Sequence, residues 1–390
     1  MLVTDRLKEL IAIPSVNPMG RDITGPEYFE ARVTEYLTDV FKTWGVPFKV
    51  TEITPGRANI VARWDGSNGR TVLLDAHQDT VPVSGMTIPP FEPAERDGKI
   101  YGRGSCDVKG GLAAMLTAFG RLVHEQPSDA ATVFLSCTCD EEAGAKGVTK
   151  LAEQITQADE SSFFWPRPEA AIVAEPTNLD VVVAHRGAVR WKIATTGRAC
   201  HSSRPEDGIN AIYRMARLLS ALEEYAGLVG DSLPPHPLCG PATLSVGRIE
   251  GGASVNIVPD ACVIEIDRRL IPGEDGESAR QQVAEFLRSK LDFEFEMQPP
   301  WIASPPLPDD DNGALADGLL KTIESIVGPH QRVGVPYGTN GSRLAAIDVP
   351  TVVFGPGDIA QAHTKDEWID IAELEQSVDV YYQFCVDGSF

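Results

Sequence analysis

Hydrophobic residues recur at two different spacings along the chain. They appear every three or four positions from Phe29 to Trp44 and from Leu112 to Val123, which predicts amphipathic helices, and Gly45 marks the expected end of the first. Short continuous apolar runs predict buried strands, at 71–76, 131–136, 170–174 and 350–354. Helices that alternate with buried strands favour an α/β layer around a largely parallel sheet.

A different order of elements begins near residue 187. A strand, a helix, two strands, a second helix and a last strand follow one another up to residue 297. In the strand expected at 262–269, Ile264 and Ile266 alternate with Glu265 and Asp267, which indicates a sheet with one covered and one wet face. The order β-α-β-β-α-β is that of the ferredoxin-like split unit.

The polar segment SPPLPDDDN at 304–312 predicts a linker, after which helical spacing resumes. We therefore expect two domains. Residues 1–186 and 304–390 would form a larger α/β domain, and residues 187–303 would form a smaller inserted one. The length of 390 residues agrees with this division, because about 150 residues per domain gives two to three domains.

Charge and composition exclude several classes of partner. The formal net charge is −22, from 34 basic and 56 acidic residues, and a field of that sign repels nucleic acid and anionic lipid. The longest uncharged, proline-free, apolar-leaning stretch has 11 residues, whereas a membrane helix needs about 18. The charged segment MLVTDRLKEL is unlike a signal peptide, and seven scattered cysteines favour reduced thiols. We expect a cytoplasmic protein with no nucleic-acid or membrane partner.

Histidine and acidic residues, the types that commonly bind metal ions, follow the predicted strands or precede a predicted helix. They are His77 and Asp79 after 71–76, Asp107 in the glycine-rich segment GRGSCDVKGG, Asp140, Glu141 and Glu142 after 131–136, Glu175 after 170–174, and His363 after 350–354. Active sites of α/β sheets lie beyond the carboxyl ends of the strands. Histidine and carboxylate ligands suit Zn²⁺, with Co²⁺ or Mn²⁺ as substitutes, and two ions can share one carboxylate and one water.

Each segment alone has another interpretation. A single histidine at a strand end is more often a structural residue than a ligand. The segment GRGSCD imitates a dinucleotide-binding turn, which keeps a nucleotide-dependent oxidoreductase as an alternative. Against that alternative, Asp107 stands in place of the third glycine, and no apolar strand leads into Gly102.

In content, order and spacing, these segments resemble the dinuclear zinc amidohydrolases and peptidases. That family includes acetylornithine deacetylase, succinyl-diaminopimelate desuccinylase, aminoacylase and the glutamate carboxypeptidases, and the resemblance covers nearly the whole chain. It implies two Zn²⁺ per chain. The residues implied are His77 and Glu175 for one ion, Glu142 and His363 for the other, Asp107 as the bridging ligand, Asp79 as a supporting carboxylate and Glu141 as the general base.

The resemblance extends to the inserted domain. The segment GRACHSSRPEDGINAI resembles a lid motif whose histidine, here His201, reaches the partner subunit's active site across a homodimer formed by these domains. Two further segments, GGASVNIVPDACVIEIDRRLIPGE and YGTNGS, resemble regions that bind substrate. The implied substrate contacts are Asn256, Arg269, Gly338 and Thr339. Asn340 stands where relatives usually carry Asp or Glu, which leaves open which end of the substrate is read there.

Simpler roles stay open for the same residues. Arg269 could pair with Asp267 on its own strand face, and His201 could cap the helix that begins near Asn210. Asn256 and Thr339 could be ordinary turn residues.

The C-terminal segment GPGDIAQAHTKDEWIDI resembles acetylornithine deacetylases more closely than the other branches. We therefore expect a deacylase of N-acyl amino acids in amino-acid biosynthesis. A hydroxide that bridges two Zn²⁺ would attack the amide, Glu141 would act as general acid and base, and one metal and His201 would stabilise the oxyanion. A desuccinylase, or a dipeptidase or carboxypeptidase, would share every ligand. A non-catalytic binding module is a remote alternative, because Glu141 and all the ligands are present.

Overall fold

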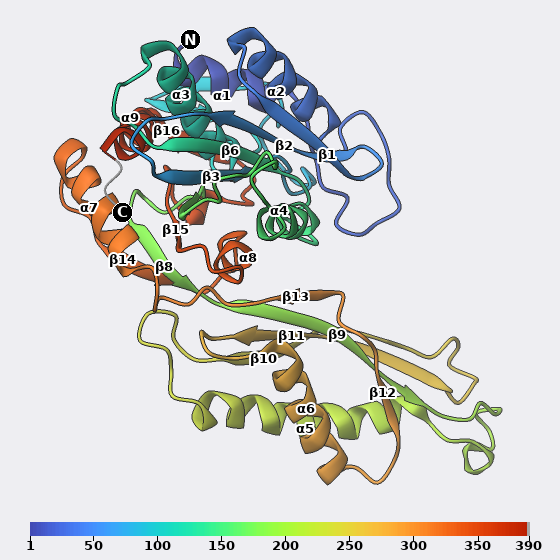
Figure 1. Cartoon of the computed structure of the whole chain (residues 1–390). Helices are drawn as coiled ribbons and strands as arrows, with labels where there is room; N and C mark the ends of the chain where they lie inside the picture. The colour runs from blue at the N-terminus through green and yellow to red at the C-terminus, as the bar shows by residue number, and fades with distance from the viewer. Residues whose placement is uncertain (388–390) are drawn as a thin grey trace. The chain divides into compact units, whose positions relative to one another are not determined.

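The chain divides into two units, and the second interrupts the first in the sequence (Figure 1). The computed structural model describes residues 1–387, apart from the side chains at positions 231 and 232. Unit 1 comprises Met1–Val183, Asp309–Val333 and the segment from Thr339 onward, and unit 2 comprises Ala184–Pro308 and Gly334–Gly338. Among the described helices, none combines the length and apolar character that a membrane span requires.

Unit 1 is built on an eight-stranded sheet with the order β1-β2-β6-β3-β7-β15-β8-β14. The strands are β1 Phe48–Thr54, β2 Arg57–Trp64, β3 Thr71–His77, β6 Thr132–Thr138, β7 Ala170–Val173, β8 Val181–His185, β14 Arg332–Val335 and β15 Thr351–Val353. The four central strands β6, β3, β7 and β15 are parallel, whereas β1, β2 and β8 pair antiparallel with their neighbours. The expected α/β fold is confirmed, and its sheet is mixed because the parallel pairing is confined to these central strands.

Helices cover both faces of this sheet. They are α1 Val3–Ala12, α2 Ala31–Trp44, α3 Lys109–Glu125, α7 Gly313–Ile326 and α9 Ile371–Asp387, together with α4 Lys146–Thr156 and α8 Gly341–Ala345. The first five share one hydrophobic core with alternate strand residues such as Val72, Leu74 and Ala76. Helices α4 and α8 pack against each other (Figure 1). The core therefore holds the carboxyl ends of the central strands in fixed positions.

A small second sheet of unit 1 brings two distant segments together. Its strands are β4 Ala94–Arg96, β5 Lys99–Tyr101 and β16 Trp368–Asp370, in the order β16-β5-β4. Trp368 pairs antiparallel with Tyr101, so the glycine-rich segment that follows β5 lies beside the segment that precedes β16.

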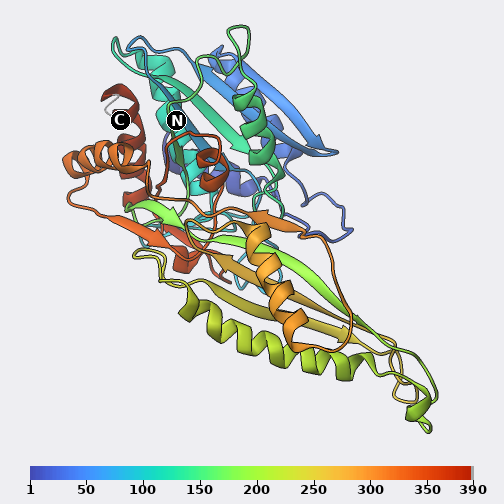
Figure 2. The same ribbon diagram turned by 60° about the horizontal axis from the view of Figure 1, so that its bottom comes forward.

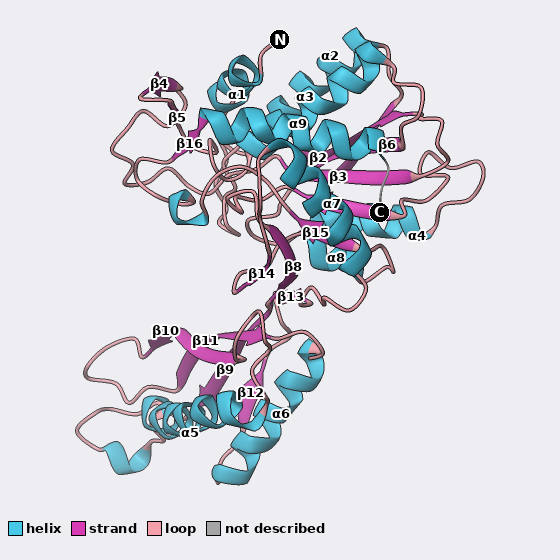
Figure 3. Ribbon diagram, turned by 90° about the vertical axis from the view of Figure 1, so that its left-hand side faces the viewer, coloured by secondary structure: helices cyan, strands magenta, loops and turns pink. Residues whose placement is uncertain are grey.

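Unit 2 has the predicted β-α-β-β-α-β order. Its elements are β9 Gly187–Thr196, α5 Ala211–Ser232, β10 Thr243–Gly251, β11 Ala261–Leu270, α6 Gly276–Lys290 and β12 Phe295–Met297. The sheet order is β10-β11-β9-β12 with antiparallel pairs, and the short strand β13 Ile302–Ser304 also pairs with β9. Both helices lie on one face of the sheet (Figures 2 and 3), and Ile264 and Ile266 are buried there.

Candidate metal centre

Acidic and histidine side chains of unit 1 gather beyond the carboxyl ends of the central strands. His77 is the last residue of β3, Glu142 comes four residues after β6, and Glu175 comes two residues after β7. Because these strands are parallel, their carboxyl ends share one edge of the sheet. Asp107 reaches the site from the loop before α3, and His363 reaches it from the loop between β15 and β16.

The Asp107 carboxylate lies between two histidines. Its Oδ1 is 3.1 Å from His77 Nε2, and its Oδ2 is 3.2 Å from His363 Nε2. His363 Nε2 also lies 3.3 Å from Glu142 Oε2. Ligand atoms of His77, Asp107 and Glu142 all lie within 4.8 Å of one another. One carboxylate that faces two imidazoles through separate oxygens is the arrangement that a ligand shared by two metal ions requires.

The carboxylates of this site are difficult to ionise together. Burial raises the pKa of Glu141 to about 8 and that of Glu142 to about 7, and nearby carboxylates add to both effects. Burial also raises the pKa of Glu175 well above its usual value, with Asp107 as the next largest cause. Such a group of acids is stabilised when a cation is bound among them.

Histidine contacts act in the opposite direction on Asp107. Burial alone would raise its pKa, but the hydrogen bonds with His363 and His77 outweigh burial and hold the pKa below its usual value. The hydrogen bonds that His363 makes with Asp107 and Glu142 raise the pKa of His363 to about 10. Glu142 Oε1 is buried and has no hydrogen-bond partner among the described residues. This set of imidazole and carboxylate donors, with an unsatisfied oxygen, fits a divalent ion such as Zn²⁺.

Asp79 supports the site and is completely buried. Its Oδ1 accepts a hydrogen bond from the Glu141 N–H at 3.1 Å, and its Oδ2 accepts one from the Glu142 N–H at 3.2 Å. Its backbone carbonyl lies 2.9 Å from His77 Nδ1. With Nδ1 facing a carbonyl, Nε2 is the nitrogen that is available to a metal ion. Asp79 therefore contacts the His77 ring and the backbone of both glutamates.

Glu367 is a site residue that the sequence analysis missed. It is completely buried and joins the loop that carries Asp107 to the segment that carries His363. Its carboxylate accepts hydrogen bonds from the N–H groups of Gly104 (3.0 Å), Cys106 (2.9 Å) and Asp107 (3.0 Å) and from Arg103 Nη1 (2.6 Å). The sequence signal was weak, because the main partners are backbone groups about 260 positions away, and these leave no side-chain pattern.

The other expected site residues are divided between the units. His201, Asn256, Arg269 and Gly338 belong to unit 2, and Thr339 belongs to unit 1. His201 is exposed, and its Nδ1 lies 2.7 Å from Ser203 Oγ. The loops of His201 and Asn256 are adjacent, since the Ser202 N–H donates to the Asn256 carbonyl at 3.0 Å. His201 does not cap α5, because Asn210 accepts the hydrogen bond from the Tyr213 N–H at that position.

Arg269 is engaged within its own sheet. Its Nε lies 2.7 Å from Asp267 Oδ1, and Asp267 also accepts a hydrogen bond from Arg190 Nε at 2.7 Å. The pairing with Asp267 considered from the sequence is therefore present. A role for Arg269 in substrate binding would require it to exchange this partner for the substrate.

Thr339 and Asn340 both point into unit 1. Thr339 is buried, and its Oγ1 accepts a hydrogen bond from the Gly341 N–H at 3.0 Å. The buried Asn340 Nδ2 donates to Asp75 Oδ2 at 3.0 Å and to Thr138 Oγ1 at 2.9 Å. Burial raises the pKa of Asp75 to about 6. The neutral amide of Asn340 therefore faces the buried carboxyl group of Asp75. An acidic residue at position 340 would place a second carboxyl group beside Asp75.

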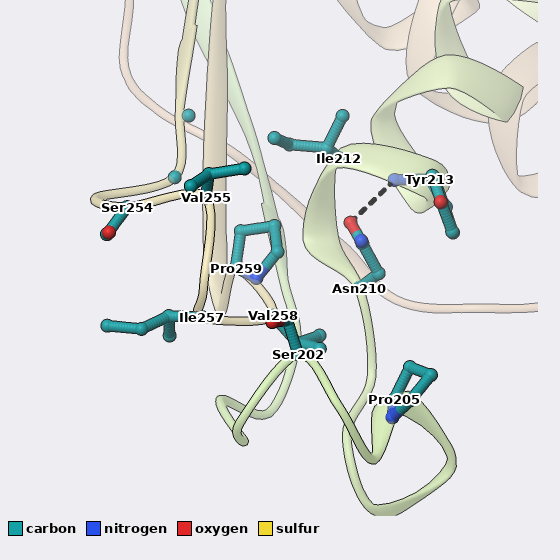
Figure 4. Close-up of a pocket in the computed structure, with 12 residues that line it drawn as sticks. Ser202, Pro205, Asn210, Ile212, Tyr213, Ser254, Val255, Ile257, Val258 and Pro259 are labelled. Atoms are coloured by element: carbon teal, nitrogen blue, oxygen red, sulfur yellow. Dashed lines mark hydrogen bonds between the residues drawn. The ribbon is translucent and has the colours of Figure 1, made fainter.

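Unit 2 contains a cavity of about 770 Å³ beside the start of α5. Ser202, Asn210, Ile212 and Tyr213 line one part of it, and residues 251–252, 254–255 and 257–259 line the other (Figure 4). Several of the apolar side chains are exposed, and Val255 is 99% exposed. A wide hollow with exposed apolar walls is typical of an interaction surface.

Comparison with known proteins gives a consistent result. Residues 73–387 match the model of Peptidase family M20/M25/M40. The chain is 33% identical over 328 residues to an acetylornithine deacetylase of Myxococcus xanthus, with 82% of this chain and 80% of the relative covered. It is 28% identical over 339 residues to a succinyl-diaminopimelate desuccinylase of Marinobacter nauticus, with 84% and 86% covered. Its fold is similar to that of an M20 family metallo-carboxypeptidase from Sulfolobus solfataricus, with a TM-score of 0.78, 18% identity and coverage of 99% and 98%.

Proposed function

The chain belongs to peptidase family M20/M25/M40, and from this premise we propose that it hydrolyses the amide bond of N-acyl amino acids. It is an acetylornithine deacetylase-like hydrolase of amide or peptide bonds. The observation that carries the proposal is the position of Asp107 between His77 and His363, with Glu142 beside them. A cytoplasmic location and a role in amino-acid biosynthesis are part of the proposal and rest on the sequence.

The family is metal-dependent, and we assign two Zn²⁺ to each chain, with Co²⁺ or Mn²⁺ as substitutes. His77 and Glu175 would hold one ion, Glu142 and His363 would hold the other, and Asp107 would hold both. When bound, the ions would polarise a water molecule and the substrate carbonyl. The buried acids support this assignment, since two divalent charges would offset their mutual repulsion.

Glu141 is the general base in this proposal. Asp79 fixes the backbone of Glu141, so the Glu141 carboxylate starts from a defined position beside the ligands. It would take a proton from the attacking water and deliver it to the leaving amine. Its pKa of about 8 is raised by burial, and cations bound nearby would lower it towards the range in which a carboxylate works as a base.

Unit 2 supplies most of the remaining parts of the proposal, and Thr339 of unit 1 supplies one. Residues 187–303 would act as a lid and as the homodimer contact, with His201 serving the partner's active site and Asn256, Arg269, Gly338 and Thr339 contacting substrate. Two features support a dimer contact there. Strand β10 lies at the edge of its sheet, and the exposed Val255 and Tyr213 flank the cavity of Figure 4.

The test is a substrate panel with the zinc-loaded protein. It contains N-acetylornithine, N-succinyl-diaminopimelate, simple N-acetyl amino acids and short dipeptides, and the E141A variant is the control. We expect the highest kcat/KM with an N-acyl amino acid. The similarity to a desuccinylase makes the N-succinyl compound the second candidate. Cleavage of dipeptides alone, or of no compound in the panel, would overturn the proposal.

A further inference from the structure

A buried cluster of one cation and three carboxylates includes Asp79, and neither the metal ligands nor the proposed base accounts for it. We call it the Arg57 cluster, and it consists of Arg57, Glu30, Asp79 and Asp140. Arg57 Nε donates to Glu30 Oε2 at 2.9 Å, and Arg57 Nη1 donates to Asp140 Oδ1 at 2.5 Å. Arg57 Nη2 lies 3.7 Å from Asp79 Oδ2. All four residues are buried, and Arg57 is the most exposed at 8%.

The cluster connects four separate segments of unit 1. Arg57 begins β2, Glu30 directly precedes α2, Asp79 follows β3, and Asp140 follows β6. The Asn17 amide adds a fifth segment, since its Nδ2 donates to Asp79 Oδ2 at 2.7 Å and to Asp140 Oδ1 at 3.2 Å. The two segments that carry Asp79 and Asp140 are also those that carry His77, Glu141 and Glu142.

Arg57 supplies the fixed positive charge of this cluster. Among the lysines and arginines of residues 1–387, Arg57 is the one that lies within ion-pair distance of Glu30, Asp79 and Asp140. Three carboxylates buried against one another repel, and each is costly to bury without a cation. A guanidinium can serve them together because its planar fork presents several N–H donors in fixed directions, which an ammonium group cannot do.

The contacts continue from the cluster into the site. Asp79 holds the N–H groups of Glu141 and Glu142, and Asp140 is their neighbour in sequence. Asp140 has a left-handed backbone (φ 64°), and its own N–H donates to Glu30 Oε1 at 3.1 Å. The carboxylates that Arg57 binds therefore hold the turn at Asp140, which sets the positions of Glu141 and Glu142.

We propose that Arg57 is a positioning residue for the segment 140–142, because its guanidinium fixes Asp79 and Asp140 and these fix Glu141 and Glu142. Arg57 acts through these carboxylates and does not touch the reacting groups. The inference rests on the proposed function, which gives Glu141 and Glu142 their roles.

The test compares Arg57→Lys with Arg63→Lys. Arg63 lies on the same strand and binds Asp65 and the carbonyls of Phe163 and Trp165, so it is a matched control. We expect R57K to keep both metal ions and a KM within about twofold, and to lose at least about tenfold in kcat, as when a residue that orients a ligand is changed. R63K should stay within about twofold of the wild type in both constants.

Two further readouts separate positioning from a purely structural role. In the E141A background, R57K should change the residual rate by less than about threefold, because the expected kcat loss arises from a displaced Glu141 carboxylate, which this background lacks. The visible absorption spectrum of the Co²⁺-loaded protein should also change in R57K and not in R63K, since Glu142 is a proposed ligand. This spectrum tests Arg57 even if the wild type hydrolyses no compound of the panel, which would be a failure of the proposed function alone.

An R57K protein with lowered Tm but unchanged kcat and Co²⁺ spectrum would overturn the inference. The inference would also be overturned if R57K lowered kcat by the same factor in the E141A background as in the wild-type background. If R57K does not fold, Asp140→Asn removes one of the three charges that Arg57 binds while keeping the side-chain shape. It is expected to show the same kcat loss and the same dependence on Glu141, and wild-type kcat in D140N would contradict the inference.

Discussion

The Glu367 carboxylate accepts a hydrogen bond from the backbone N–H of Asp107 at 3.0 Å. Two more N–H groups of the same loop and Arg103 bind this carboxylate. Since Glu367 lies four residues after His363, one buried side chain sets the position of a proposed bridging ligand relative to a proposed terminal ligand. The glycine-rich loop, which has little intrinsic preference for one shape, thereby acquires one.

Glu367→Gln should weaken metal binding by about 10- to 100-fold, because one carboxylate oxygen is replaced by an NH₂ group that faces N–H donors. Competition with a chelating dye measures this affinity. Asp370→Asn is the control, because Asp370 also accepts a backbone N–H, that of Ala372, but at the start of α9. Equal metal affinity in E367Q and D370N would show that Glu367 does not position the loop.

Glu141→Ala should leave two metal ions bound and lower kcat by at least about 100-fold, the low end for the loss of a general base. Metal analysis and steady-state kinetics on the best substrate of the panel measure the two effects. Glu153→Gln removes an exposed carboxylate of α4 that pairs with Lys150, and it should change neither. Near-normal turnover in E141A would remove Glu141 from the mechanism.

Asn340→Asp should destabilise unit 1, because it places a second buried carboxylate beside Asp75, which now accepts a hydrogen bond from Asn340 at 3.0 Å. Urea unfolding at pH 8 should show a loss of at least about 2 kcal/mol. The loss should shrink towards pH 5, where one of the two carboxyls holds a proton. The double variant D75N/N340D, which exchanges acid and amide, should recover most of the stability. An N340D protein as stable as the wild type at pH 8 would contradict this account.

A buried histidine at the end of β8 should make stability depend on pH. His185 is completely buried, and burial lowers its pKa to about 4, whereas an unfolded histidine titrates near 6.5. The unfolded chain therefore binds more protons between these values, so stability falls as the pH drops from about 6.5 towards 4, by roughly 3 kcal/mol in total.

His185→Asn keeps an N–H group near the Arg186 carbonyl, which lies 3.0 Å from His185 Nδ1, but cannot titrate. Unfolding free energies of the chelator-treated protein from pH 4.5 to 7.5 should therefore fall less steeply in H185N. His330→Asn is the control, because His330 makes a similar contact with the Gly328 carbonyl but is partly exposed. Parallel profiles for H185N and the wild type would show that His185 is not the cause.

The sequence indicated which side chains gather because each of them is tied to a strong local pattern. His77 and Glu175 follow apolar runs that fold as the parallel strands β3 and β7, and parallel strands end at one edge. The run at 181–185 is equally apolar, yet it folds as β8, antiparallel to β15. The hydrophobicity of a strand indicates that the strand is buried but does not indicate its direction. The mixed character of the sheet could therefore not be predicted.

Arg57 and Glu367 could not be predicted for a related reason. Their partners are carboxylates and backbone N–H groups that lie 83 and 260 positions away, for Asp140 and Asp107 respectively. A single charged residue in a strand or loop more often faces solvent, and only the tertiary fold shows that these two are buried. Asn340 is a similar case, since its partner Asp75 is visible only once β3 and the start of α8 are placed together.

We predict that two metal ions, held around Asp107, are needed for amide hydrolysis. The most direct test measures the hydrolysis of N-acetylornithine by chelator-treated protein as Zn²⁺ is added back. We predict that chelation abolishes the activity and that the full rate returns at about two ions per chain. Unchanged activity after chelation, or a full rate at one ion per chain, would contradict the account.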